Sequence, residues 1–204
     1  MSKKFIVAIG ASEGGLRPLT AFFDFVPHDQ ATYVILRHLP VDSKSQLQVI
    51  LERHSKLMIK EVENGMIIEK DVIYMPPSES YITIANDRLY LQARIDHQLY
   101  PNRIIDVFLE SLANAKGKFS VVVIMSGSGT DGVRGTGLIR KAGGLVVVQT
   151  LKTCEYHEMP GNVLNAGPVD LELNPADMPA ALQSHINTLL KNSNNISNLK
   201  EMAS

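Results

Sequence analysis

Short runs of strongly apolar residues recur along this chain of 204 residues, and segments with helical periodicity separate them. The clearest runs are residues 5–9, 32–36, 119–125 and 145–149. Continuous apolar runs, unlike alternating ones, are typical of strands that are buried on both faces of a parallel sheet. The pattern therefore predicts an α/β fold in a single domain, with a doubly wound, mostly parallel sheet and helices on both faces.

Apolar residues spaced three and four apart predict helices at residues 16–23, 43–54, 102–115, 133–142 and 175–190. The third of these has an apolar stripe formed by Ile104, Ile105, Phe108, Leu109 and Leu112. Residues 58–62 and 72–75, with a hairpin of 81–85 and 89–92, are expected to form a short antiparallel excursion from the main sheet. We assign residues 4–190 to the domain and expect the polar tail, residues 191–204, to be disordered.

Composition excludes several classes of function. A net charge of −1 leaves no electrostatic footprint for nucleic acid or for an anionic membrane. The single cysteine, Cys154, cannot form a disulfide within the chain, and no pair of histidines has metal-ligand spacing on a helix. We expect no metal and no organic cofactor. Without an apolar signal segment or a run of about 18 apolar residues, we also expect a cytoplasmic protein with no membrane insertion.

Three chemically distinctive side chains each follow one of the predicted strands. Ser12 lies in "GASEGG", His38 in "RHLP" and Asp131 in "SGSGTDG". Because the carboxyl ends of parallel strands meet at one edge, where ligands bind, we expect these side chains to share that edge. A serine hydroxyl becomes a good nucleophile when a histidine removes its proton and a carboxylate orients the histidine. The sequence therefore predicts a Ser-His-Asp triad.

Each of the three residues also has a purely structural interpretation. Ser12 could be a helix N-cap, His38 could bind backbone at a strand end, and Asp131 could form a turn or cap the helix that follows it. The glycine-rich stretch 10–15 could instead bind a phosphate or a nucleotide. No Gly-Lys-Ser/Thr pattern completes a P-loop there, however, and His38 stands where an acidic ribose partner would be needed. The conjunction of three residues at one edge favours the triad.

Several sequence blocks carry a resemblance to a known family. In chain order they are "IGASEGGL", "RHLP", "VIYMPPSESYITI", "NRIIDVFLESLA", "VVVIMSGSGTDGVRGTGLIRKAGGLVVVQ" and "EMPGNVLNAGPVD". Together they resemble the catalytic domain of the chemotaxis-type protein-glutamate methylesterases, the CheB family, over about residues 4 to 190. The greatest similarity is to methylesterase segments that are fused to, or encoded with, chemotaxis methyltransferases.

The resemblance implies a role for each site residue. Ser12 would be the nucleophile, His38 the base and Asp131 the group that orients it. The backbone N–H groups of Glu13 and Ser128 would form the oxyanion hole, at positions where the family often has threonine and methionine. Backbone donors tolerate such changes of side chain, and we expect the Glu13 carboxylate to be a rim group that points away from the reaction.

The function implied is hydrolysis of glutamate γ-methyl esters on the cytoplasmic helices of chemoreceptors, together with deamidation of receptor glutamines. A chemotaxis methyltransferase is a further implied partner. The alternative is a catalytically quiet module that binds a receptor or a methyltransferase. Members of the family often carry an N-terminal receiver domain, but only residues 1–4 precede the first strand here. We therefore expect the activity of this chain to be independent of a phosphodonor.

Overall fold

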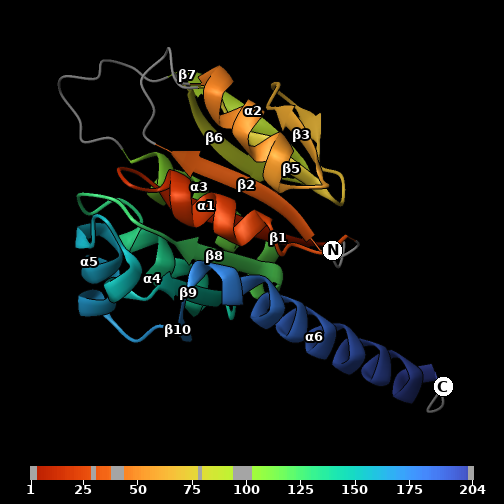
Figure 1. Cartoon of the computed structure of the whole chain (residues 1–204). Coiled ribbons are helices and arrows are strands. Elements are labelled where there is room, and N and C mark those ends of the chain that lie inside the picture. Colours follow the sequence, from red (N-terminus) through yellow and green to blue (C-terminus); the bar gives the residue numbers. More distant parts are fainter. Residues whose placement is uncertain (1–3, 29–30, 38–43, 78–79, 94–102, 202–204) are drawn as a thin grey trace.

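The computed structural model describes residues 4–28, 31–37, 44–77, 80–93 and 103–201. Its centre is a seven-stranded sheet with the strand order β10-β9-β8-β1-β2-β5-β3, in which every neighbouring pair is parallel (Figure 1). The strands are β1 (Phe5–Ala11), β2 (Ala31–Arg37), β3 (Met58–Glu61), β5 (Val72–Met75), β8 (Ser120–Ile124), β9 (Leu145–Gln149) and β10 (Leu171–Leu173). The four runs that sequence predicted as buried strands are thus confirmed.

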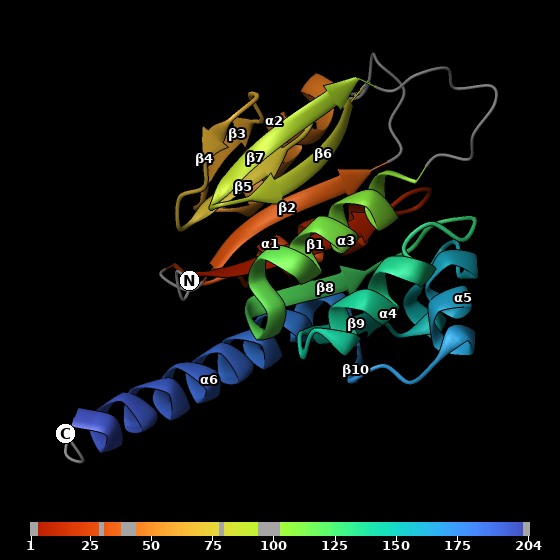
Figure 2. The ribbon, with the colours of Figure 1, turned by 180° about the vertical axis from the view of Figure 1, so that it is seen from behind.

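Helices cover both faces of this sheet, as expected (Figures 1 and 2). One face carries α1 (Leu16–Phe23), α2 (Lys44–His54) and α6 (Met178–Glu201), whereas the other carries α3 (Ile104–Lys116), α4 (Val133–Lys141) and α5 (Glu158–Ala166). Successive residues of a strand face opposite sides, so Val7 packs into the core of the first face and Ala8 into that of the second. All five residues of the predicted apolar stripe on α3 are buried.

The antiparallel part of the fold is smaller than the sequence suggested. It contains β4 (Met66–Ile67), β6 (Ser80–Ala85) and β7 (Arg88–Ala93), in the order β4-β7-β6, and it packs against α3. The predicted hairpin is confirmed, and its turn residues Asn86 and Asp87 have φ values of 50° and 57°. We were wrong to place β3 and β5 in this excursion. Every residue of β5 is buried, so it pairs beside β2 and extends the parallel sheet.

The last helix is longer than expected. A 3₁₀ turn at Pro175–Asp177 leads into α6, which passes the predicted end at Leu190 and continues to Glu201, away from the body of the fold (Figure 1). Asparagine and serine lower helix propensity, but only glycine or proline would break the helix, and neither occurs after Pro179. Residues 202–204 lie outside the described part. Among the described helices, none has the length and apolar character needed to cross a bilayer.

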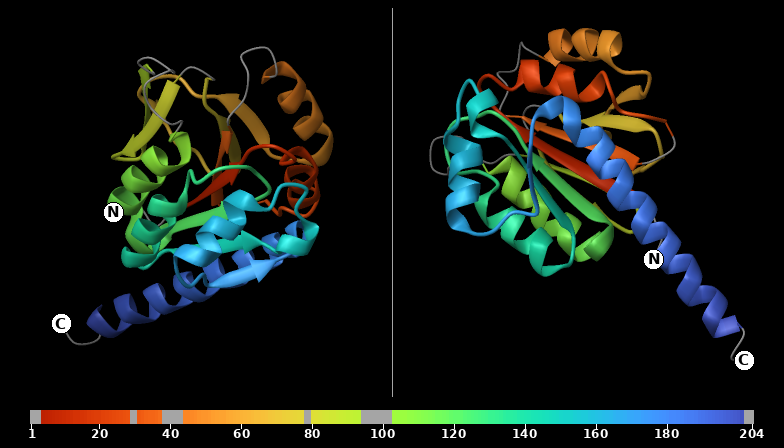
Figure 3. Two further views of the ribbon diagram at one scale, coloured as in Figure 1. Left: turned by 90° about the vertical axis from the view of Figure 1, so that its left-hand side faces the viewer. Right: turned by 60° about the horizontal axis from the view of Figure 1, so that its bottom comes forward.

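The topology marks one position on the carboxyl edge of the sheet. After β1 the chain builds β2, β3 and β5 on one side of β1, and it then returns to place β8, β9 and β10 on the other side. The direction of winding therefore reverses between β1 and β8. Ligands of open α/β sheets bind in the crevice at such a switch point. The left-hand view of Figure 3 shows this edge from outside, because the arrowheads of β2 and β8 point towards that side in Figure 1.

Candidate active site

Ser12 is the first residue after β1, at the switch point, and it is 7% exposed. Its N–H donates to the carbonyl oxygen of Ser126 (3.0 Å), which continues the pairing of the β1 and β8 segments beyond their ends. Its own carbonyl accepts from the N–H of Gly15 (3.1 Å) and closes a tight turn into α1. Gly15, not Ser12, is the N-cap of that helix, so the interpretation of Ser12 as an N-cap is wrong.

The glycines around Ser12 permit close approach of separate loops. Gly14 has φ +68°, and a Cβ atom there would lie 2.8 Å from the Cβ of Glu155 and 2.8 Å from the Oγ of Ser126. A Cβ atom on Gly127 would lie 2.9 Å from the Cβ of Ser12. The segments that follow β1, β8 and β9 therefore meet at Ser12 with no room for further side chains.

The loop after β8 is fastened to the chain that follows β9. Gly127 donates its N–H to the carbonyl of Tyr156 (3.0 Å) and accepts from the N–H of Met159 (2.9 Å). Further along, the side-chain amide of Asn162 donates to the carbonyl of Gly129 (2.9 Å), and the Gly129 N–H donates to the Glu158 carboxylate (3.3 Å). These contacts hold the loop against the N-terminal half of α5.

A buried glutamine supports the same loop. Gln149 ends β9 and is 1% exposed, and its side-chain oxygen accepts from the N–H of Ser126 (2.9 Å). Its side-chain NH₂ donates to the carbonyl of Thr153 (2.9 Å). Sequence reasoning missed Gln149 and Ser126. The signal that was available is a polar residue at the end of an otherwise apolar strand, which must find a partner when it is buried.

The two predicted oxyanion donors lie on these loops. Glu13 is exposed, and Ser128 is half-buried. Within the described residues, neither backbone N–H donates a hydrogen bond. Two loops that touch at Ser12 and Gly127 thus each contribute one backbone donor that is available to a ligand.

Asp131 is buried and binds the start of a helix. Its two carboxylate oxygens accept from the N–H groups of Ile105 and Asp106, each at 2.9 Å. Asp106 in turn accepts from the N–H groups of Gly132 (3.1 Å) and Gly135 (2.7 Å) at the start of α4. Asp131 therefore caps α3, the helix that carries Asp106, and Asp106 caps α4, the helix that begins just after Asp131. The suggestion that Asp131 caps the following helix is wrong, because it caps α3, which precedes it.

These two carboxylates share one buried region. Burial is the main cause that raises the pKa of Asp106 above its usual range, and the nearby charge of Asp131 adds to the effect. The region adjoins the end of β1, because Cβ atoms on Gly10 and Gly132 would both come within 3.0 Å of Ile105. Ser12 and Asp131 therefore follow neighbouring strands on the same edge of the sheet.

His38, the third predicted member of the triad, lies outside the described residues. The residue before it, Arg37, ends β2 and is the register partner of Ala11 in β1. In the chain, Ser12 thus follows Ala11 and His38 follows Arg37, the register partner of Ala11. No group of three His, Cys, Asp or Glu side chains in the described ranges is arranged to hold a metal ion.

Cys154 is a poor candidate for a second nucleophile at this edge. It follows β9 and is partly buried, and burial raises the pKa of its thiol to about 11. A thiol with that pKa is protonated at neutral pH, and only the thiolate is strongly nucleophilic.

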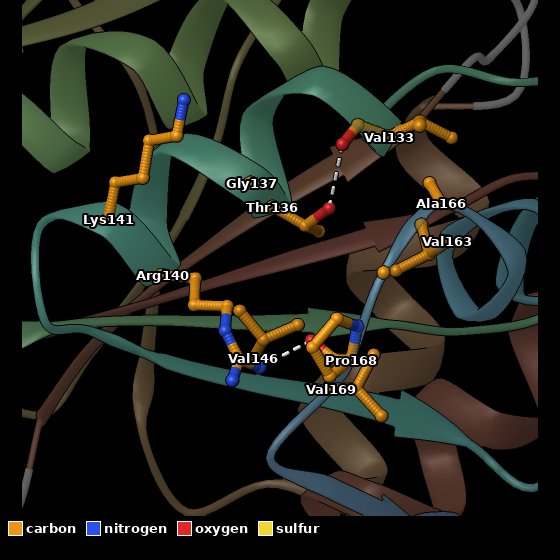
Figure 4. A pocket seen from close by; sticks show the side chains of 11 residues that line it. Val133, Thr136, Gly137, Arg140, Lys141, Val146, Val163, Ala166, Pro168 and Val169 are labelled. Carbon is orange, nitrogen blue, oxygen red and sulfur yellow. Dashed lines mark hydrogen bonds between the residues drawn. The ribbon is translucent and has the colours of Figure 1, made fainter.

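A cavity of about 400 Å³ lies elsewhere, between α4 and α5 (Figure 4). Valine side chains line much of it, and the guanidinium of Arg140 at its side donates to the carbonyl of Pro168. Neither Ser12 nor Asp131 lines this cavity. It is therefore separate from the edge where the candidate residues gather.

Comparison with known proteins identifies relatives of the chain. The family model described as CheB methylesterase matches residues 7–182. A protein-glutamate methylesterase/protein-glutamine glutaminase 2 of Xanthomonas oryzae pv. oryzae (strain MAFF 311018) is 32% identical over 178 residues, which are 86% of this chain and 49% of that protein. A protein-glutamate methylesterase/protein-glutamine glutaminase of Methanococcus maripaludis is 28% identical and covers 85% of this chain and 48% of that protein. The chain thus spans about half the length of these curated relatives.

A solved structure shares the fold. The CheB methylesterase catalytic domain of Thermotoga maritima superimposes with a TM-score of 0.82 at 26% identity, and the match covers 90% of this chain and 99% of that domain. The family resemblance seen in the sequence blocks is therefore confirmed over nearly all of the α/β fold. With its sequence matched from residue 7 to residue 182 and its sheet shared with a solved catalytic domain, this chain belongs to the CheB methylesterase family.

Proposed function

We propose that this chain hydrolyses glutamate γ-methyl esters in protein substrates, with Ser12 as the nucleophile. The observation that carries the proposal is the placement of Ser12 on a tight turn at the switch point, where its own loop meets the loop after β8 and each loop has an available backbone N–H donor. Such an arrangement suits acyl transfer, in which a tetrahedral intermediate forms beside the nucleophile and its negative oxygen needs preorganised donors.

The proposed mechanism has two halves. In the first, Ser12 Oγ attacks the ester carbonyl, His38 removes the hydroxyl proton, and the N–H groups of Glu13 and Ser128 stabilise the oxyanion. His38 then returns the proton to the leaving oxygen, and methanol departs. In the second half, His38 activates water, which attacks the acyl-enzyme and restores the free serine. Asp131 would orient the imidazole throughout.

The position of each member supports this assignment. Ser12 follows β1, His38 follows Arg37 at the end of β2, and Asp131 lies in the loop after β8. These three strands are neighbours in the sheet. The hydrogen bonds that Asp131 accepts from Ile105 and Asp106 use one lone pair on each carboxylate oxygen. A carboxylate has about four such positions, so a carboxylate that caps α3 can also accept from a histidine.

The substrates we propose are glutamate methyl esters, because the curated relatives are named protein-glutamate methylesterases. Their location on the cytoplasmic helices of chemoreceptors is the expectation that the sequence resemblance gave. The names of these relatives also include protein-glutamine glutaminase, so we propose deamidation of receptor glutamines as a slower second activity, since an amide has a poorer leaving group. A methyltransferase partner stays a prediction from the sequence. Exposed Glu13 lies at the rim of the site, so its carboxylate need not oppose the oxyanion.

A fluorophosphonate probe tests the proposal without knowledge of the receptor. Ser12 Oγ would form a bond to phosphorus, fluoride would leave, and the hydroxyl proton would pass to the base. We expect stoichiometric labelling of the wild-type chain at Ser12 and none of Ser12→Ala. Methanol release from a methylated receptor fragment should fall by about 10⁴- to 10⁶-fold in the same variant. A folded wild-type chain that the probe leaves unlabelled would instead support the catalytically quiet module.

A further inference from the structure

One buried hydroxyl joins the three segments that meet at the candidate site. Ser126 is 0% exposed, and its Oγ lies 3.1 Å from the carbonyl oxygen of Glu13 and 3.2 Å from that of Tyr156. The same Oγ accepts from the N–H of Tyr156 (3.0 Å). A serine hydroxyl has one proton and two lone pairs, so it donates to one or shares its proton between the two carbonyls while it accepts from the amide.

The main chain of Ser126 is bound to the same surroundings. Its N–H donates to Gln149, and its carbonyl accepts from the N–H of Ser12. Every polar group of Ser126 therefore has a partner. Ser12 and Glu13 lie just after β1, and Gln149 and Tyr156 lie at the end of β9 and beyond it.

The two bonds to the nucleophile turn have a specific geometric effect. The N–H of Ser12 and the carbonyl of Glu13 stand at opposite ends of the Ser12-Glu13 dipeptide, and Ser126 binds both of them. Between these two anchored groups lies the Glu13 N–H, which is the first proposed oxyanion donor. Ser128, which supplies the second, is only two residues beyond Ser126. Ser126 thus binds backbone groups on both sides of the Glu13 N–H, and it lies two residues before Ser128.

We propose that Ser126 is a positioning residue, whose hydroxyl sets the direction of the Glu13 N–H relative to Ser12 Oγ. The inference rests on the proposed function. Loss of the hydroxyl frees the Glu13 carbonyl, so the Glu13–Gly14 peptide can rotate. The preceding peptide, which carries the Glu13 N–H, then keeps only the bonds of the Ser12 N–H and the Ser12 carbonyl, and the donor points less accurately at the developing oxyanion. Misplacement of a reacting group by about 1 Å costs on the order of 100-fold in rate. The expected effect is therefore on the chemical step and not on binding.

The test compares Ser126→Ala with Ser120→Ala. Ser120 is also 0% exposed and opens the same strand, and its hydroxyl donates to the carbonyl of Gly117 at the opposite edge of the sheet. Both variants lose one buried hydroxyl, and Ser126→Ala should lower the melting temperature more, because Ser126 Oγ binds three backbone groups and Ser120 Oγ binds one. The readout is the fluorophosphonate reaction of the full chain, analysed as kinact and KI, with Ser12→Ala as the blank.

We expect kinact of Ser126→Ala to fall about 10- to 100-fold with KI within threefold of wild type, and Ser120→Ala to match wild type in both constants. Irreversible unfolding would lower the fraction labelled at completion, and reversible unfolding would raise the apparent KI. Both leave kinact unchanged, so instability cannot imitate the result. Equal kinact values for the two variants would overturn the positioning role. A wild-type chain that does not label would overturn the proposed function first.

A second variant covers the case in which Ser126→Ala does not fold. Ser126→Cys retains a side chain of similar shape but replaces the hydroxyl with a weak donor and acceptor. We expect the kinact of Ser126→Cys to lie between those of wild type and Ser126→Ala. If Ser126→Ala cannot be purified, the expectation is a kinact of Ser126→Cys below that of wild type. A cysteine variant that labels as fast as wild type would contradict the proposal.

Discussion

β8 begins at one buried serine and is followed by another, and the two hydroxyls bind very different parts of the chain. Ser120 Oγ, at the amino end, donates to Gly117, three residues earlier. Ser126 Oγ, past the carboxyl end, binds Glu13 and Tyr156, which are 113 and 30 residues away. The amino end is closed by a local turn, whereas the carboxyl end is assembled from segments that are distant in the sequence.

We therefore expect changes at the amino end of β8 to affect mainly stability, and changes at its carboxyl end to affect function as well. The hydrogen bond of Ser120 is made within a few residues of the chain, although Gly144 also packs closely against Ser120. The carboxyl end requires β1, β8 and β9 to be in place together, and only then do the loops meet around Ser12. Loops held by a rigid sheet in this way are where binding and catalytic residues concentrate. Changes at the two ends should therefore have different consequences.

The largest expected effect in this comparison comes from Asp131→Asn. A triad carboxylate replaced by its amide favours the wrong histidine tautomer, and a known case loses about 10⁴-fold in rate. We expect a loss of about 10³- to 10⁴-fold in fluorophosphonate labelling. The asparagine NH₂ would also face a backbone N–H of α3, so the stability should fall in a urea titration as well.

Asp106→Asn is the matched control for that variant, because Asp106 makes the reciprocal pair of bonds to α4. It should lose helix-capping stability of about 0.5–2 kcal/mol while its labelling rate stays within tenfold of wild type. Equal losses of rate in the two variants would mean that Asp131 acts only as a helix cap.

A smaller effect is expected on the alkylation rate of Cys154, the other side chain at the carboxyl edge that could act as a nucleophile besides Ser12. Because burial raises the pKa of Cys154 to about 11, the thiolate fraction at pH 7 is about 300-fold lower than for a free thiol of pKa near 8.5. Iodoacetamide should alkylate the folded chain more slowly by roughly that factor, and the rate should rise with pH towards 11. Alkylation as fast as in the urea-unfolded chain would show that the thiol is not protected.

The smallest expected effect on activity belongs to the far end of α3. Lys116 is the last residue of that helix, and its buried ammonium pairs with Asp87 in the hairpin turn. Lys116→Met removes one partner of a pair whose loss costs several kcal/mol when both charges are buried. Since Asp87 is 31% exposed, we expect about 1–3 kcal/mol less stability in urea unfolding and an unchanged labelling rate.

The exposed Lys141, which ends α4, gives the control for this variant, since Lys141→Met should change neither stability nor labelling. A tenfold loss of labelling in Lys116→Met would show that the antiparallel sheet is coupled to the carboxyl edge, and the separation of the two ends would then fail.

The elements that sequence predicted well share a strong local signal. The runs that became β1, β2, β8 and β9 are apolar throughout because both of their faces are covered, and the stripe on α3 has a clear helical period. The Asn86-Asp87 turn was readable because those residue types tolerate positive φ. For β3 and β5 the signal was too short, and their proximity in the chain to a hairpin suggested the wrong partner strands.

The sequence by itself determined which side chains stand at the ends of parallel strands, because strand periodicity and the glycine-rich blocks are local properties. Ser12 and Asp131 were correctly placed after β1 and β8 in this way, whereas the position of His38 lies outside the described residues and the catalytic roles of all three remain predictions. Only the tertiary structure decided what those side chains touch. Asp131 caps α3 and not α4, and Ser126 reaches Glu13 across 113 residues. Such bonds depend on where whole elements pack, and that is set by burial of the two faces of the sheet and not by any short stretch of residues.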